Sequence, residues 1–183
     1  KLRGFNSAVK AGKTVFSPAS GIRNVLSNVS LAFTQGHMSP ATIKRAIQLS
    51  FDTSPEAVAI KTRLYELGIF GTSARGGEME RHMEIAMAGF DFSNFDVTSG
   101  KAWREVHDRF KAAGRKVGKV SEFMQAFYKW GDDVFKLNGM IHEAQHYGSS
   151  TAQKLTADEA IEQVIMNKRN KKLAERLAFE VRD

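Results

Sequence analysis

The chain has 183 residues, of which 42% are hydrophobic, and it contains no cysteine. This hydrophobic content supports one moderate domain or two small helical subdomains and excludes an intrinsically disordered chain. The absence of cysteine excludes disulfide bonds and thiolate metal sites. No apolar run approaches the roughly 20 residues that a membrane-spanning helix requires. The formal net charge of +7 favours a polyanionic partner, but a solvated basic face or a patch that meets an acidic protein chain accounts for it equally well.

Three Ser-Pro pairs predict three successive helix starts in the first part of the chain. Serine caps the free N–H groups of a first turn, and proline at the first helical position loses no hydrogen bond. The predicted helices span Pro18 to Gln35, Pro40 to about Leu49, and Pro55 to Leu67. The first and third are expected to end at Gly36 and Gly68, a common position for glycine. Four residues of the third helix are expected to be buried: Ala57, Ile60, Leu64 and Leu67.

The middle of the chain is predicted to contain two loops and two helices. A glycine-rich loop from Gly71 to Gly77 precedes a short helix from about Glu78 to Ala88. A second loop, from Gly89 to Gly100, is rich in Asn, Asp and Gly, and its three phenylalanines are expected to pin it. A helix then runs from about Lys101 to Ala113, with Trp103, Val106 and Phe110 inward, and glycines 114 and 118 are expected to interrupt it.

The longest predicted element runs from about Ser121 to Tyr147. Its apolar residues recur in steps of four and three, which is typical of packed helices. This seam consists of Phe123, Phe127, Trp130, Val134, Leu137 and Ile141, and we interpret it as core or as contact with a neighbouring subunit. After a linker from Gly148 to Lys154, Thr156 and Glu159 form a predicted capping box that opens the last helix. A basic run before Leu173 is expected to split that helix.

These elements predict an all-α fold, a multi-helix array or bundle of about six to eight helices. We expect an N-terminal helical subdomain at residues 1–70, a loop-rich connector with a short helix at 71–100, and a long-helix subdomain at 101–183. The chain begins with Lys1 and ends on charged residues, which indicates a fragment of a larger protein.

One catalytic motif is present in the long helix, where His142-Glu143-Ala144-Gln145-His146 reads H-E-x-x-H. Two histidines four residues apart share a helix face and can bind one Zn²⁺, with Glu143 as general base. A zinc metallopeptidase needs a third ligand, for which Glu159 and Glu162 are the candidates, and a β-sheet beside the cleft. Since no strand is predicted, a polar helix end with two exposed histidines is the favoured interpretation.

Two other motifs are interpreted as structural. Gly131-Asp132-Asp133 resembles the G-D-D of polymerases, but it lies in a helical pattern, where Lys136 and Lys129 are spaced for ion pairs with Asp132 and Asp133. The loop from Gly71 to Gly77 lacks a Walker lysine and follows a helix, which argues against a phosphate-binding loop.

Two basic clusters are candidate phosphate contacts. Phosphate binding of this kind depends on salt and not on base sequence, and a solvated helix face explains the same clusters equally well. No aromatic residues interleave with them, which argues against a surface for stacking single-stranded bases. The clusters comprise Lys111, Arg115, Lys116 and Lys119 in the first and Lys168, Arg169, Lys171 and Lys172 in the second, with Arg176 beside it.

Two blocks of short motifs add a resemblance to a known family. The first, between Lys10 and Asn28, reads Lys13-Thr14-Val15-Phe16, Ser17-Pro18-Ala19-Ser20, Ile22-Arg23-Asn24 and Leu26-Ser27-Asn28. The second, between Tyr128 and Val164, reads Trp130-Gly131-Asp132-Asp133, Phe135-Lys136-Leu137, Ile141-His142-Glu143 and Ala157-Asp158-Glu159-Ala160-Ile161. Together they cover about a third of the chain and resemble a helical region of the large polyvalent proteins of tailed bacteriophages, a family that includes internal virion, or ejection, proteins.

The resemblance implies a structural or interaction segment that takes part in genome ejection or in assembly of the portal–tail core. It implies a location in the virion interior with delivery into the host cell, other virion proteins of the portal, tail or core as partners, and a homo-oligomer. The basic faces would turn toward double-stranded DNA or an anionic envelope. It implies no cofactor and no catalytic residue here, so enzymatic activity of the parent would belong to other domains. The family pattern requires no H-E-x-x-H, which favours a chance origin for His146. A zinc metallopeptidase and a non-specific nucleic-acid-binding helical domain are the competing hypotheses.

Overall fold

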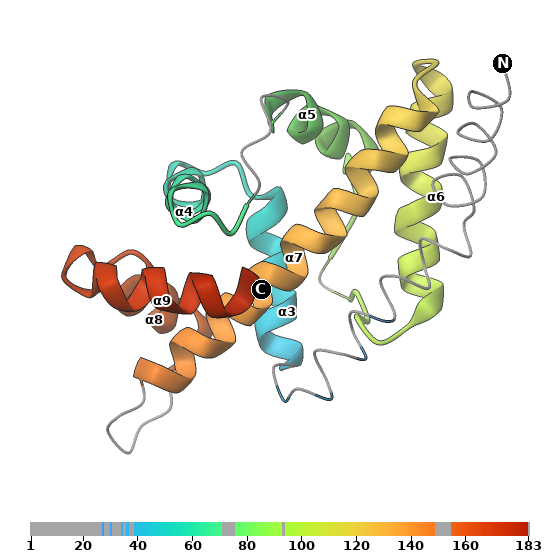
Figure 1. Cartoon of the computed structure of the whole chain (residues 1–183). Helices are drawn as coiled ribbons and strands as arrows, with labels where there is room; N and C mark the ends of the chain where they lie inside the picture. Colours follow the sequence, from blue (N-terminus) through green and yellow to red (C-terminus); the bar gives the residue numbers. More distant parts are fainter. Residues whose placement is uncertain are drawn as a thin grey trace, which may run out of the picture. The chain divides into compact units, whose positions relative to one another are not determined.

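The computed structural model describes residues 27, 30, 34, 36, 39–70, 76–92, 94–148 and 155–182. These residues form seven α-helices, α3 to α9, with a π-helical segment and a 3-10 turn, and they contain no β-strand (Figure 1). The predicted all-α class is therefore confirmed. The predicted helix from Pro18 to Gln35 lies mostly outside the described residues. Within the described part, no helix is long and apolar enough to cross a lipid bilayer.

The chain divides into two compact units, and each is described by itself. The described residues of unit 1 come from the ranges 1–30 and 75–131, and those of unit 2 from 31–74 and 132–183. Unit 1 contains α5 (Gly76–Met87), α6 (Gly100–Lys116) and the start of α7 (Val120–Gly148). Unit 2 contains α3 (Pro40–Phe51), α4 (Pro55–Glu66), the rest of α7, α8 (Ala157–Ala160) and α9 (Lys171–Arg182). The predicted boundaries at residues 70 and 100 stay predictions.

Unit 1 is built on an aromatic core between α6 and the start of α7. The ring centroids of Trp103 and Trp130 lie 5.7 Å apart, and those of Phe110 and Phe127 lie 5.6 Å apart. Trp103 also donates from Nε1 to the carbonyl oxygen of Val97 at 2.7 Å, which satisfies its buried polar atom. The loop between α5 and α6 contacts this core through Phe95, whose ring meets Trp103 edge-on at 5.1 Å. The prediction that phenylalanines pin this loop is confirmed.

The predicted interruption at Gly114 is wrong, because α6 continues through it to Lys116. A Cβ at position 114 would lie 2.8 Å from the Cα of Val120 and 3.1 Å from the Cβ of Phe123. Glycine at this position therefore permits close approach of α6 and α7 and does not break the helix. The helix ends at Lys116, and Gly118 just beyond it has a φ of 70°, a conformation that glycine adopts without strain.

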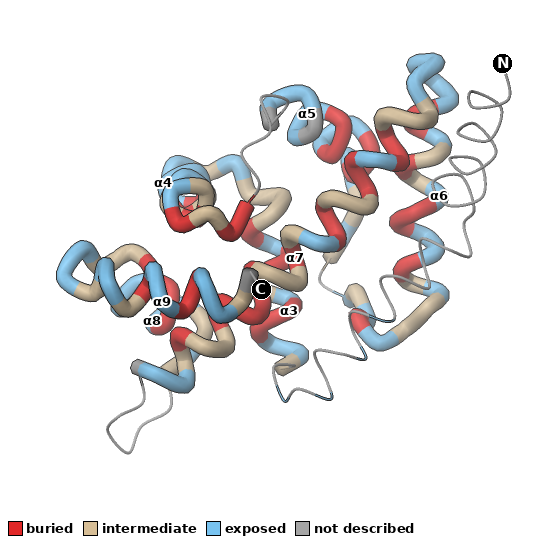
Figure 2. Tube along the Cα trace, in the orientation of Figure 1, coloured by how far each residue is buried: buried red, intermediate tan, exposed pale blue. Residues whose placement is uncertain are grey.

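The seam of α7 is buried along its whole length. All six predicted seam residues, from Phe123 to Ile141, have at most 1% of their surface exposed. Figure 2 shows buried positions alternating with exposed ones along α6 and α7, as expected for amphipathic helices. The seam is therefore core of this chain, which is the first of its two predicted interpretations.

In unit 2, the Ser-Pro starts of α3 and α4 are confirmed, although only one serine caps through its side chain. Ser54 Oγ accepts from the backbone N–H of Ala57 at 3.2 Å, whereas the side chain of Ser39 makes no capping bond. The predicted end at Gly68 is confirmed, with φ at 73°. Ala57, Ile60, Leu64 and Leu67, the residues predicted to be buried in the third helix, are all buried.

A buried hydrogen bond joins α3 to α7 within unit 2. Thr42 Oγ1 donates to Asn138 Oδ1 at 2.6 Å, and both residues are almost fully buried. A polar group that is buried needs a partner, so this bond favours one register of the two helices over registers that separate the pair. At the next position, a Cβ on Gly139 would meet Val181 Cγ1 of α9 at 3.2 Å, which shows how closely α9 packs on α7.

The predicted split of the last helical region is confirmed. A π-helical segment, η1 (Ile161–Ile165), follows α8, and a 3-10 turn, η2 (Lys168–Asn170), precedes α9. Two side chains satisfy carbonyl groups in η1: Arg63 Nε donates to Ile165 O at 3.3 Å, and Asn170 Nδ2 donates to Gln163 O at 2.8 Å. The carbonyl groups of Gln163 and Ile165 thus have side-chain partners in this irregular segment.

Gly114→Ala is predicted to destabilise the chain by about 1–3 kcal/mol, because the new Cβ overlaps the backbone of Val120. The matched control is Gly77→Ala in α5, where no atom lies within 4 Å of the added Cβ. The control should lose no stability, since alanine is the better helix former. Urea unfolding followed by circular dichroism measures both, and equal stability of the two variants would contradict the close approach.

Candidate functional site

The histidine pair of the H-E-x-x-H motif lies near the end of α7, in unit 2. His142 is partly buried and His146 is exposed, with its ring edge-on to Tyr147 at a centroid distance of 6.0 Å. Among the described residues, one group of three His, Asp or Glu side chains converges closely enough to hold a metal ion, and it includes neither of these histidines. Of the two histidines that the sequence predicts to be exposed, His146 is exposed and His142 is not, because its side chain is 23% exposed.

Glu159, one candidate for the third zinc ligand, is engaged in the predicted capping box. Its Oε2 accepts from the backbone N–H of Thr156 at 2.7 Å and from Thr156 Oγ1 at 2.9 Å. These bonds, the backbone one first, hold the pKa of the Glu159 carboxyl below its ordinary value of 4.5. The other candidate, Glu162, is exposed within η1. The capping box thus gives Glu159 a structural role.

The G-D-D sequence lies inside α7, where its interpretation as helix surface is supported. Lys136 Nζ lies 2.8 Å from Asp132 Oδ2, one of the predicted pairs at i,i+4. A two-metal polymerase site requires aspartates on a strand and turn, and these positions are helical. Residues 71–75 of the glycine-rich stretch lie outside the described part of the chain.

The candidate phosphate contacts divide into paired and unpaired cations. Lys119 lies near two carboxylates, and Lys171 Nζ lies 3.8 Å from Glu175 Oε1. Within the described residues, the other six form no ion pair with an acidic side chain: Lys111, Arg115, Lys116, Lys168, Arg169 and Lys172. Lys111 is partly buried and the other five are exposed. These six therefore have charge available for a partner.

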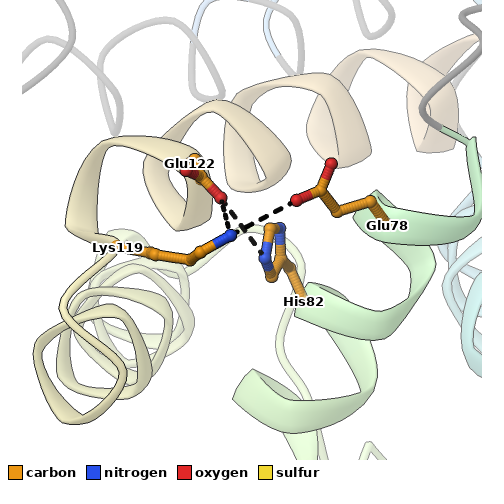
Figure 3. Close-up of polar contacts among 4 residues, drawn as sticks. All are labelled: Glu78, His82, Lys119 and Glu122. Carbon is orange, nitrogen blue, oxygen red and sulfur yellow. Dashed lines mark hydrogen bonds and ion pairs between the residues drawn. The ribbon is translucent and has the colours of Figure 1, made fainter.

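Sequence reasoning did not find a group of four ionisable side chains in unit 1. We call it the Glu78 cluster, and it consists of Glu78 and His82 of α5, Glu122 of α7, and Lys119 just before α7 (Figure 3). Lys119 Nζ lies 2.9 Å from Glu122 Oε2 and 3.4 Å from Glu78 Oε1. His82 Nε2 lies 3.8 Å from Glu122 Oε2. The i,i+4 spacing of Glu78 and His82 is the signal in the sequence that could have found half of this cluster.

The electrostatics of the Glu78 cluster keep Lys119 as an ammonium ion. Glu122, through a hydrogen bond and its charge, and then Glu78 raise the pKa of Lys119 above its ordinary value of 10.5. A nucleophilic lysine needs a lowered pKa, so the cluster is unsuited to amine chemistry. The arrangement instead concentrates carboxylates and one imidazole around a cation.

No family model matches the sequence, and neither a curated protein nor a solved structure matches it. The bacteriophage resemblance therefore has no support from these comparisons.

Thr156→Ala is predicted to destabilise the chain by about 1 kcal/mol, because the hydroxyl that caps α8 is lost. Thr156→Ser, which keeps the hydroxyl, is the control. Since the pKa of Glu159 is lowered by folding, the stability from this carboxylate is present above pH 4.5 and is lost as pH falls through the lower, folded-state pKa. The difference in unfolding temperature between Thr156→Ala and the unmodified chain should therefore become smaller below pH 4.5. A difference that widens in acid would contradict the capping box.

Proposed function

We propose that this chain is a helical structural and interaction segment of an internal virion protein of a tailed bacteriophage. In this proposal it takes part in genome ejection or in assembly of the portal–tail core, and it contacts double-stranded DNA through an exposed face of α6. The virion assignment rests on the two resembling sequence blocks. The DNA contact rests on one observation, a row of cations on α6 that carry no acidic partner among the described residues.

The row of cations follows the helical repeat of α6. Lys101, Arg104, Lys111 and Arg115, together with Asp108, are separated by steps of three and four residues, which places them on one side of the helix. Within the described part of the chain, none of the four basic side chains pairs with a carboxylate. Three of them are exposed, and Lys111 is partly buried. We call these four residues the α6 stripe.

The opposite side of α6 anchors the stripe to the core. Trp103, Val106 and Phe110 are fully buried, so the outward direction of the basic side chains is set by the packing of unit 1. From Lys101 to Arg115 the helix rises about 21 Å, at about 1.5 Å per residue. A duplex of that length presents about six phosphates on each strand, which suits several simultaneous contacts.

Two arginines with internal partners, Arg109 and Arg176, are weaker candidates for the DNA contact than the α6 stripe. Arg109, on the same helix, lies 3.8 Å from Glu105 Oε1 and also covers the ring of Phe90 at 4.7 Å. Arg176 lies 3.9 Å from Glu180 Oε1 and 4.9 Å from the centroid of Tyr147. Charges with such internal partners are partly neutralised, whereas at the stripe four basic side chains share one side of the helix with a single carboxylate, Asp108.

DNA binding is predicted to become less dependent on salt when the stripe is neutralised. Combining Arg104→Gln, Lys111→Gln and Arg115→Gln should reduce the slope of log K against log salt by about 0.9 for each phosphate that the chain no longer neutralises. The control combines Arg109→Gln, Lys136→Gln and Arg176→Gln, which removes the same charge from ion-paired sites. Fluorescence anisotropy with a labelled duplex measures both. An equal decrease of the slope in the two variants, or no binding of the unmodified chain at low salt, would contradict the proposed contact.

The virion assignment predicts that the parent protein is a component of purified particles. Mass spectrometry of the virions should detect it. External protease should leave it intact in closed particles and digest it once the particles are opened. Absence from the particles would contradict the virion assignment and would leave the DNA-binding measurement as a separate test.

A further inference from the structure

The Glu78 cluster has the donor set of a metal site. One ligand atom from each of Glu78, His82 and Glu122 lies within 4.8 Å of the other two. An imidazole and two carboxylates form a set of three ligands that suits zinc and neighbouring divalent transition metals, with a fourth position for water. Figure 3 shows the three side chains pointing toward one place from α5 and α7. The convergence requires tertiary packing and is independent of the α6 stripe.

A cation already occupies the focus of this cluster. The Lys119 ammonium lies within 3.4 Å of a carboxylate oxygen on each glutamate, and Figure 3 shows it between them. The two glutamates and Lys119 sum to one negative charge, so the three ligands retain an excess that attracts positive charge. The ammonium shows where a metal ion would be held.

We propose that Glu78, His82 and Glu122 bind a divalent transition-metal ion of the zinc class, and that the Lys119 ammonium competes with the metal for this place. The metal would tie the start of α7 to α5, so it would act as a structural clamp in unit 1. If the metal binds the folded chain and not the unfolded chain, it stabilises the fold. Above the dissociation constant, this stabilisation increases with the logarithm of the metal concentration.

Replacement of the Lys119 ammonium by a metal ion requires a fixed histidine and a mobile lysine, and the exposure of the side chains fits this requirement. His82 is 8% exposed, and its ring packs on Phe123 at a centroid distance of 4.4 Å, so the imidazole is held in place. The Lys119 side chain is 48% exposed, and its flexible stem can turn into solvent without disturbing the core. The two glutamate side chains are about half exposed, so each has room to change rotamer.

One of the three ligand separations is already close to that of a tetrahedral metal site. Ligand bonds of about 2.0–2.2 Å place neighbouring tetrahedral donors about 3.4 Å apart. His82 Nε2 and Glu122 Oε2 are 3.8 Å apart, close to that separation. The Glu78 carboxylate must move closer to the other two ligands, and its side chain, which is 52% exposed, can do so by changing rotamer.

Calorimetric titration of the metal-free chain with Zn²⁺ tests the proposal. Lys119→Met removes the competing charge and should tighten binding at least tenfold, while Glu78→Gln in that background should reverse most of the gain. His82→Gln should reduce affinity at least tenfold, and helicity by circular dichroism confirms that each variant is folded. Because Glu78 is exposed, its variant keeps the test decisive even if a variant at the buried His82 fails to fold.

His142→Ala combined with His146→Ala is the matched control, because it removes the other histidine pair that could bind zinc. This double variant should leave Zn²⁺ affinity unchanged. Loss of binding in the control with no effect of Glu78→Gln would overturn the proposal. So would the absence of binding at about 1 mM Zn²⁺ in both the unmodified chain and Lys119→Met, or equal affinity of these two.

Discussion

The apolar seam of α7 is the contact on which both units depend. Phe123, Phe127 and Trp130 contribute to unit 1, and Val134, Leu137 and Ile141 contribute to unit 2. Burial of side chains of this kind stabilises a fold by about 1.5–3 kcal/mol each, so the seam dominates other local contributions. Since these six side chains are used inside the chain, a partner must be recognised by other groups. In the proposed function, those groups are the basic side chains of the α6 stripe.

The charges on those surfaces divide into two kinds. Several cations lie opposite a carboxylate three or four residues away, as Lys136 does with Asp132. Such exposed pairs contribute only about 0.3–0.5 kcal/mol, so they explain little of the stability. In the proposed function they matter more, because they neutralise some positions, whereas the four basic side chains of the α6 stripe form no ion pair within the described residues. The distribution of pairing, and not the net charge of +7, is what distinguishes one helix face from another.

Local signals in the sequence predict most of the helices. The Ser-Pro starts, the capping box of Thr156 and the repeat of the α7 seam all act within a few residues, where one chain segment determines its own geometry. The prediction at Gly114 is wrong because the reason for this glycine is not local: the neighbour that requires it is Val120, across the turn to α7. The hydrogen bond from Thr42 to Asn138 joins residues 96 positions apart, and the sequence of neither segment alone predicts it.

The two candidate metal motifs show why helical spacing alone is insufficient. His142 and His146 have the spacing of a zinc motif, but a spacing of i,i+4 supplies only two ligands, and no third joins them among the described residues. Glu78 and His82 have the same spacing without matching a known motif, and the turn between α6 and α7 brings Glu122 to them. A turn that depends on Gly118 and on the close approach at Gly114 thus determines where three ligands converge. The packing that buries the aromatic core therefore also brings the three ligands of the proposed metal site together. A motif that depends on spacing alone cannot detect this packing, so it indicates His142 and His146 instead.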